Sequence, residues 1–260
     1  MTMQASVEGD AVKRARIYFV MALALLATAF IGFLPTFWAP MTRSQFVPSA
    51  SVGIHAMIAF SWLLLFTAQT WLIVTRRTRP HRALGLLGIS LATLMTVFGV
   101  LASINMVHRA ELAHGLDAGL TFMIVPLSGI FLFALFVTLA IVNIPRPEWH
   151  KRFMFVATAQ AIGAAVVRPF IYFLGFQGHM PVPVGLPSPP PPVDLFAIDE
   201  GLSDLFLLVP MIYDWRTRGR PHPAYLIGFA AVVGLQLLKQ SISATVAWHD
   251  FAAWVYSLAH

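Results

Sequence analysis

Long apolar runs dominate the pattern of hydrophobic and polar positions along this chain. Seven of them are long enough to cross a hydrocarbon core of about 30 Å, which takes about 20 residues of helix. The runs show no strict alternation of polar and apolar positions, so we expect helices rather than strands. The predicted membrane helices are Ile17–Trp38, His55–Val74, Leu84–Val107, Leu116–Val142, Phe153–Phe176, Leu195–Ile212 and Ala224–Val246.

Composition indicates the same fold class. Of the 260 residues, 58% are hydrophobic and 11% are charged, which is too little charge for the surface of a soluble domain. We therefore predict an all-α fold, a polytopic membrane bundle of seven transmembrane helices without a soluble domain. The chain has no cysteine, which excludes disulfides, thiolate metal sites and thiol nucleophiles.

The segments between the apolar runs set the predicted domain boundaries. Residues 1–16 form a cytoplasmic N-terminal tail, 17–247 the transmembrane domain and 248–260 an outer C-terminal tail. Within the domain, the helices after the first form three hairpins. Residues 177–194 form an outer loop whose proline density favours an extended conformation.

The basic residues predict the orientation of the bundle. Thirteen of the 17 lysines and arginines fall in segments on one side, against Arg43 and Arg109 on the other. Because cytoplasmic loops are enriched in Lys and Arg, we expect a multi-pass protein of the inner membrane with its N-terminus in the cytoplasm and its C-terminus outside. The net charge of +6 therefore reports topology, and the expected partner is the lipid bilayer rather than a nucleic acid.

Histidines lie near the predicted helix ends and alternate between the two sides. His55 and His114 lie at the outer side, and His81 and His150 lie at the inner side. A b-type haem needs two imidazoles, one at each axial position of its iron. Antiparallel helices would bring His55 to His114 and His81 to His150. The pattern therefore predicts two haem sites on opposite sides of the membrane.

This order of four histidines resembles that of the di-haem b-type cytochromes that oxidise ascorbate or act as ferric reductases. The resemblance implies haem b as cofactor, the four histidines as axial ligands, and electron transport across the membrane from a quinone or another small electron donor. Separately, HRALG at His81 and WHKRFM at His150 resemble segments of uncharacterised bacterial multi-pass membrane proteins. That likeness implies a family but no activity.

A metal-dependent hydrolase is one alternative. At the inner side, His81, His150, His222 and Asp214 could hold a zinc ion with an open position for water. Seven helices with a cytoplasmic N-terminus resemble the ceramidase and adiponectin-receptor class of zinc hydrolases. The H-x-x-x-H of that class is absent from the last helix here. Whether the chain is an enzyme stays undecided at this point.

A cofactor-free transporter or sensor is the other alternative. Arg168, Asp204 and Lys239 fall inside predicted helices at similar depth, and Gln236 lies one turn from Lys239. An intramembrane charge costs roughly 3 kcal/mol or more unless it is paired or hydrated, so we expect these residues to share one polar cluster. The cluster would bind substrate or protons, or lock the helices as ion pairs. Alternatively, Arg168 and Lys239 would bind haem propionates.

Overall fold

The computed structural model describes residues 2–43, 49–174, 190, 193 and 196–259, with the backbone alone for residues 2–14, 170–174 and 196–199. Regular structure within these ranges is helical, without strands, which confirms the all-α class. The elements are α1 (Thr2–Phe33), the π-helical η1 (Leu34–Trp38), α2 (Ala39–Thr42), α3 (Ala50–Val74), α4 (Thr78–Leu112), α5 (Leu116–Phe122), α6 (Ile124–Val142), α7 (Pro147–Gln160), α8 (Gly163–Leu174), α9 (Phe196–Arg218), α10 (Pro223–Ser243) and α11 (Val246–Ser257).

Several helices have the character of membrane spans. Five helical segments are long and apolar enough to cross a membrane, which marks the chain as a multi-pass helical membrane protein. They are Ala15–Thr42, Ala50–Val74, Thr78–Leu112, Leu116–Val142 and Pro223–Ser243.

The two other predicted membrane helices differ from these five. The segment predicted at Phe153–Phe176 consists of α7 and α8, which are separated after Gln160, and its last two residues lie outside the described ranges. The segment predicted at Leu195–Ile212 becomes α9, which continues to Arg218 and carries several charged residues. The predicted N-terminal tail is part of α1, and most of the predicted C-terminal tail is part of α11.

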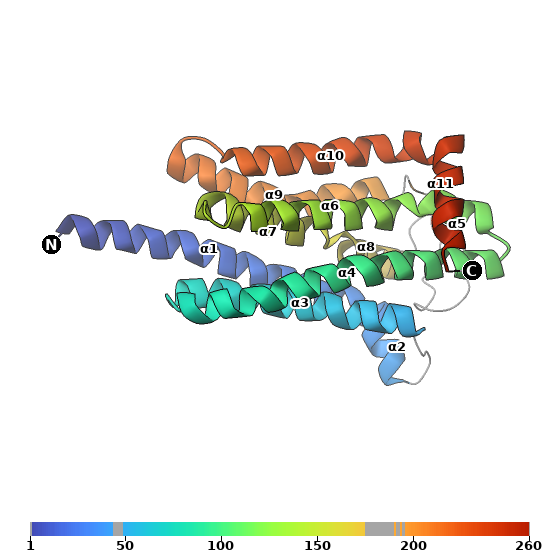
Figure 1. Cartoon of the computed structure of the whole chain (residues 1–260), viewed down its shortest axis with the longest axis horizontal. Coiled ribbons are helices and arrows are strands. Elements are labelled where there is room, and N and C mark those ends of the chain that lie inside the picture. The colour runs from blue at the N-terminus through green and yellow to red at the C-terminus, as the bar shows by residue number, and fades with distance from the viewer. Residues whose placement is uncertain (1, 44–48, 175–189, 191–192, 194–195, 260) are drawn as a thin grey trace.

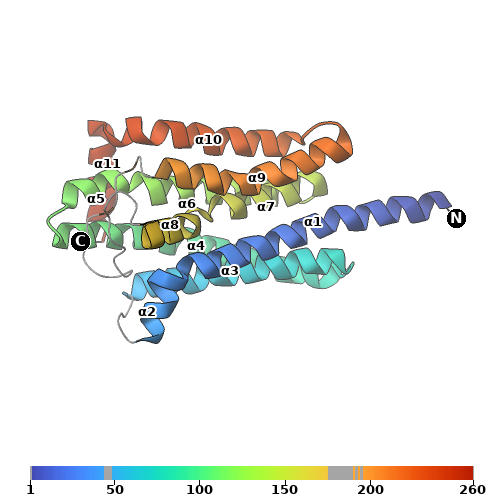
Figure 2. The same ribbon diagram turned by 180° about the vertical axis from the view of Figure 1, so that it is seen from behind.

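The long helices run side by side along one axis (Figures 1 and 2). The turns at 75–77, 143–146 and 219–222 lie at the end that also carries the N-terminus, and the C-terminus lies at the opposite end. Because arginines are concentrated in and beside these turns, we call this end the basic end and the other the far end. Helices α3 and α4, α6 and α7, and α9 and α10 each form an antiparallel pair across one such turn.

Local sequence explains why the chain reverses at these turns. Arg76 and Gly219 have positive φ angles of 59° and 77°, a conformation that ends a helix. Pro147 and Pro223 occupy the first helical positions of α7 and α10, where the missing N–H is not needed. The His222 side chain accepts a hydrogen bond from the Ala224 N–H at 3.2 Å and so caps α10.

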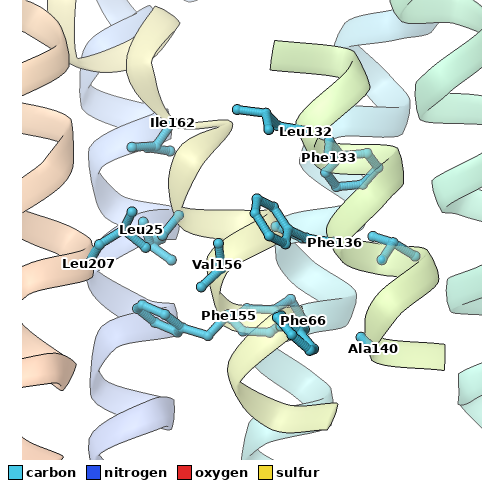
Figure 3. Close-up of a cluster of buried hydrophobic side chains, with 14 of the residues drawn as sticks. Leu25, Phe66, Leu132, Phe133, Phe136, Ala140, Phe155, Val156, Ile162 and Leu207 are labelled. Atoms are coloured by element: carbon cyan, nitrogen blue, oxygen red, sulfur yellow. The ribbon is translucent and has the colours of Figure 1, made fainter. Parts of the chain in front are cut away.

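Helix α7 lies at the centre of the bundle. Phe155 and Val156 are fully buried, and Figure 3 shows them surrounded by Phe66 of α3, Phe136 of α6 and Leu207 of α9. The Phe155 ring also contacts the rings of residues on α1 and α10. A helix enclosed by protein on all sides does not need an apolar surface toward lipid, which explains why α7 and its charged first turns are compatible with a membrane bundle.

Two glycines permit the closest helix contacts. A Cβ on Gly32 of α1 would overlap the carbonyl oxygen of Ala165 in α8. A Cβ on Gly228 of α10 would come within 2.8 Å of the Val156 side chain in α7. Small residues at such crossings are typical of membrane bundles, where packing rather than water exclusion holds helices together.

Candidate functional site

The structure brings His81 and His150 to the same place at the basic end. Helix α4 begins at Thr78 and α7 begins at Pro147, so each histidine lies at the end of the first turn of its helix. The charge of His150 acts on His81. The pairing of these two histidines as ligands of one haem stays a prediction.

The His150 imidazole is oriented by a hydrogen bond to the backbone. Its Nδ1 lies 2.9 Å from the carbonyl oxygen of Ala140 at the end of α6. Because a carbonyl oxygen only accepts, Nδ1 carries the proton and Nε2 of the neutral ring keeps its lone pair. A hydrogen bond of this kind is the usual way in which proteins fix the tautomer and orientation of a metal-binding histidine.

His81 is also held through its backbone, and its side chain has a nitrogen that is unpartnered in the described part of the chain. Its backbone carbonyl accepts a hydrogen bond from Nε2 of Gln69 in α3 at 3.1 Å, which fixes this part of α4. Its Nδ1 is buried and has no hydrogen-bond partner among the described residues. Buried polar atoms are nearly always satisfied, so an unsatisfied imidazole nitrogen beside a second imidazole fits a site that takes a further ligand.

The predicted outer pair is not brought together in the same way. His55 on α3 lies against α4 at the level of Gly99, with its Cε1 3.6 Å from the position of a Gly99 Cβ. His114 follows the end of α4, and α4 rises roughly 20 Å between Gly99 and Leu112 at about 1.5 Å per residue. Two ligands of one iron must lie within a few ångströms of each other, and this offset is far larger. The Nδ1 of His55 is also buried without a hydrogen-bond partner in the described structure.

The basic end also holds a network of charges, the Arg152 cluster, formed by Glu148, Lys151, Arg152, Asp214 and Arg218. Arg152 is 0% exposed. Its Nε and Nη2 donate to the two carboxylate oxygens of Asp214, each at 2.8 Å. Such a bidentate pair is the strongest geometry for an arginine and a carboxylate, and it joins α7 to α9.

Glu148 links the other cations of the cluster. Its carboxylate accepts from Nη1 of Arg152 at 2.7 Å and from Nζ of Lys151 at 2.6 Å, and it forms an ion pair with Nη2 of Arg218 at 2.6 Å. Burial alone would raise the pKa of Glu148, but the hydrogen bonds and charges of Lys151 and Arg152 lower it to about 2. The carboxylate is therefore ionised at every physiological pH.

His222 lies beside this cluster, packed against an aromatic ring. The centroid of its imidazole is 4.9 Å from that of Trp149, edge to face. Burial and the nearby Arg152 lower the pKa of His222. Its Nδ1 is used for the cap of α10, and Asp214 is bound by arginine. Across the described residues there is no group of three His, Cys, Asp or Glu side chains placed to hold a metal ion.

The predicted polar cluster inside the bundle is arranged as contacts between α9 and α10. Lys239 forms an ion pair with Glu200, whose side chain is mostly enclosed. One turn along each helix, Nε2 of Gln236 donates to Asp204 at 3.3 Å. Arg168 lies on α8, where its guanidinium is 4.3 Å from the ring centroid of Phe33.

The position of Lys239 is relevant to the prediction that Arg168 and Lys239 bind haem propionates. Helix α10 rises roughly 25 Å between His222 and Lys239 at about 1.5 Å per residue, and α8 lies in the far half of the bundle (Figure 2). Arg168 and Lys239 are therefore far from the His81 and His150 pair. Arg82 is a cation next to His81 in sequence, and its charge acts on His81.

Sequence reasoning missed two functional groups. Arg152 is not among the predicted site residues, although Glu148, four residues earlier, is a signal for a helical ion pair. Glu200 is not among them either, although it lies four residues before Asp204 and therefore on the same helix face.

Comparison of the chain with models of known protein families, with curated proteins and with solved structures gave no match. The function must therefore be argued from the residues themselves.

Proposed function

We propose that this chain is a membrane b-type haem protein in which His81 and His150 bind one haem at the basic end. The observation that carries the proposal is the state of the two imidazoles. One has its Nδ1 hydrogen-bonded to the Ala140 carbonyl, which leaves Nε2 free. The other has a buried nitrogen without a partner in the described residues. They lie on different helices at the same end of the bundle, and the charge of one acts on the other, which supports their role as the two axial ligands of one iron.

The surrounding residues have definite roles in this proposal. Ala140 and Gln69 fix the position of α7 and α4 around the two rings. Arg82 supplies a positive charge for a propionate. The Arg152 cluster holds α7 against α9, so that His150 stays in place. A haem bound there supplies one-electron exchange, with a quinone or another small molecule as the donor.

The proposal also specifies the number of membrane crossings and their orientation. We propose seven crossings of the inner membrane, with α7 and α8 together as the fifth and α9 as the sixth, and with the N-terminus in the cytoplasm. The concentration of arginines in and beside the three turns at the basic end supports this orientation. The haem would then lie near the cytoplasmic side. The offset between His55 and His114 argues for one such site rather than two, so electron transfer through the whole membrane is not part of the proposal.

An absorption spectrum of the purified protein tests the proposal. Protein from haem-replete cells should show a Soret band that shifts on reduction. His81→Gln and His150→Gln should each abolish or strongly weaken that band. His114→Gln is the matched control and should keep it. A colourless protein, or a Soret band that survives both substitutions, would rule the proposal out.

The contacts between α9 and α10 favour one second candidate, a cofactor-free transporter or sensor. An ion pair enclosed within the bundle, such as Lys239 with Glu200, is a common site for protons or charged substrates. A colourless wild-type protein whose transport or signalling activity is lost in Lys239→Met would support this candidate over the haem protein.

A further inference from the structure

Helix α11 is set apart from the rest of the bundle by its direction. Two residues separate it from the end of α10, and its first turn is capped by Thr245, whose Oγ1 accepts from the Trp248 N–H at 3.1 Å. Figure 1 shows α11 crossing the far ends of α5 and α4 instead of running along them. Since α10 is a candidate membrane span that ends at Ser243, α11 starts at the level where that span leaves the hydrocarbon.

One side of α11 is fastened to the bundle. Ala252 and Val255 are buried in an apolar cluster with residues of α4 and with Met123, between α5 and α6. The Trp248 indole donates to the Leu120 carbonyl at 3.0 Å, and the Tyr256 hydroxyl donates to Glu111 at 2.5 Å. These contacts fix the rotation of the helix about its own axis, so the side that faces away from the bundle is fixed as well.

The outward side of α11 is divided into two edges. At about 3.6 residues per turn, Ala247, Phe251, Trp254 and Leu258 fall along one edge. Val246, Asp250, Ala253 and Ser257 fall along the other. All eight side chains are exposed, and Val246, Trp254 and Leu258 remain 77%, 57% and 62% exposed. The first edge is therefore apolar, with three large side chains, and the second is mixed, with the polar side chains Asp250 and Ser257.

We infer that α11 lies in the interface of the bilayer, with its apolar edge inserted between lipid headgroups and acyl chains and the edge of Asp250 and Ser257 toward water. Amphipathic helices with aromatic side chains bind the interface in this way. Leu237 and Leu238, near the end of α10 from which α11 starts, are also 76% and 56% exposed. The inference depends on the membrane character of the bundle and not on haem.

The absence of cysteine from the chain permits a direct test by site-directed spin labelling. Ala247→Cys and Ala253→Cys change two exposed alanines of the same helix, one on each edge. Each variant is labelled with a nitroxide and reconstituted in liposomes. Its accessibility to oxygen, which concentrates in lipid, is then compared with its accessibility to a water-soluble nickel chelate. We expect the oxygen-to-nickel ratio to be several-fold higher at position 247 than at position 253.

Two results would overturn the inference. Equal preference for the nickel chelate at both positions would place the whole outward side in water. Dipolar broadening of the label at position 247 that disappears on dilution with unlabelled protein would show that a second copy of the chain, and not lipid, covers the apolar edge. Neither result would alter the haem spectrum, so the two proposals fail independently.

Discussion

Among single residues, Arg152 has the most demanding environment. Its guanidinium is completely buried, is bound at both ends by carboxylates and lies 5.5 Å from the ring centroid of Tyr225. The hydroxyl of Tyr225 in turn donates to that of Tyr18 at 3.0 Å. The charge thus connects α7 to α9, and the aromatic residues beside it connect α10 to α1.

Asp214→Ala should therefore destabilise the protein strongly. The substitution removes the bidentate partner of a buried cation, which typically costs about 3–5 kcal/mol. Thermal unfolding in detergent, followed by circular dichroism, measures the change. Arg216→Ala, at an exposed position two residues away, is the control and should have little effect. If Asp214→Ala is as stable as this control, the pair does not hold α7 and α9 together.

Glu148 should make stability dependent on pH in the acidic range. Its pKa in the folded protein is about 2, below its ordinary value of 4.5. A group whose pKa is lowered by folding contributes stability above the ordinary value, and this contribution is lost as the pH falls. The wild type should therefore be more stable than Glu148→Gln above about pH 4.5, and the difference should shrink between pH 4.5 and 2. A difference that stays constant over that range would contradict this role.

How far single residues could be predicted depends on whether their partners are local in sequence. The positions of His81 and His150 at one end followed from helix boundaries, which apolar runs define well. The ion pair of Arg152 with Asp214 joins positions 62 residues apart. Charge counting assigns both residues to the membrane surface, and only tertiary packing shows that they are buried together.

At the scale of elements, burial within the bundle separates two kinds of helix. Helix α4 has many large apolar side chains exposed along its length, and hydropathy identifies it easily. Helix α7 faces other helices, and α9 has a buried face beside an exposed apolar one that includes Leu205 and Val209. The sequences of both helices carry charges that pair inside the protein. Hydropathy predicts contact with lipid, and it therefore finds the outer helices more reliably than the central ones.

The crossing of α1 and α8 should depend on the absence of a side chain at Gly32. In Gly32→Ala, the new Cβ would overlap the Ala165 carbonyl, and forced separation of packed elements costs about 1–3 kcal/mol. Gly234→Ala is the matched control, because a Cβ there meets nothing within 4 Å. Melting temperatures in the same detergent should fall for the first variant and not for the second. Equal melting temperatures would show that the crossing is not tightly packed.

At the scale of the whole molecule, a scheme of seven membrane crossings and a scheme of five place the region from α7 to α9 differently. If α7 with α8 and α9 both cross, Val193 lies outside the cell membrane while Thr217 lies in the cytoplasm. Single cysteines at these two positions, treated in spheroplasts with a membrane-impermeant maleimide, distinguish the two schemes. We expect labelling of Val193→Cys and protection of Thr217→Cys until the membrane is opened. Protection at both positions would indicate that this region stays on the cytoplasmic side.

The central position of α7 has a consequence for how the protein is made. During synthesis α7 emerges before α9 and α10 exist, so Arg152 then has Glu148 of its own helix as a partner but not Asp214. A buried arginine that lacks one of its carboxylate partners is destabilising. We therefore expect α7 to remain beside α6 at the translocon until α9 delivers Asp214. The insertion of α7 therefore depends on α9, which follows it in the chain.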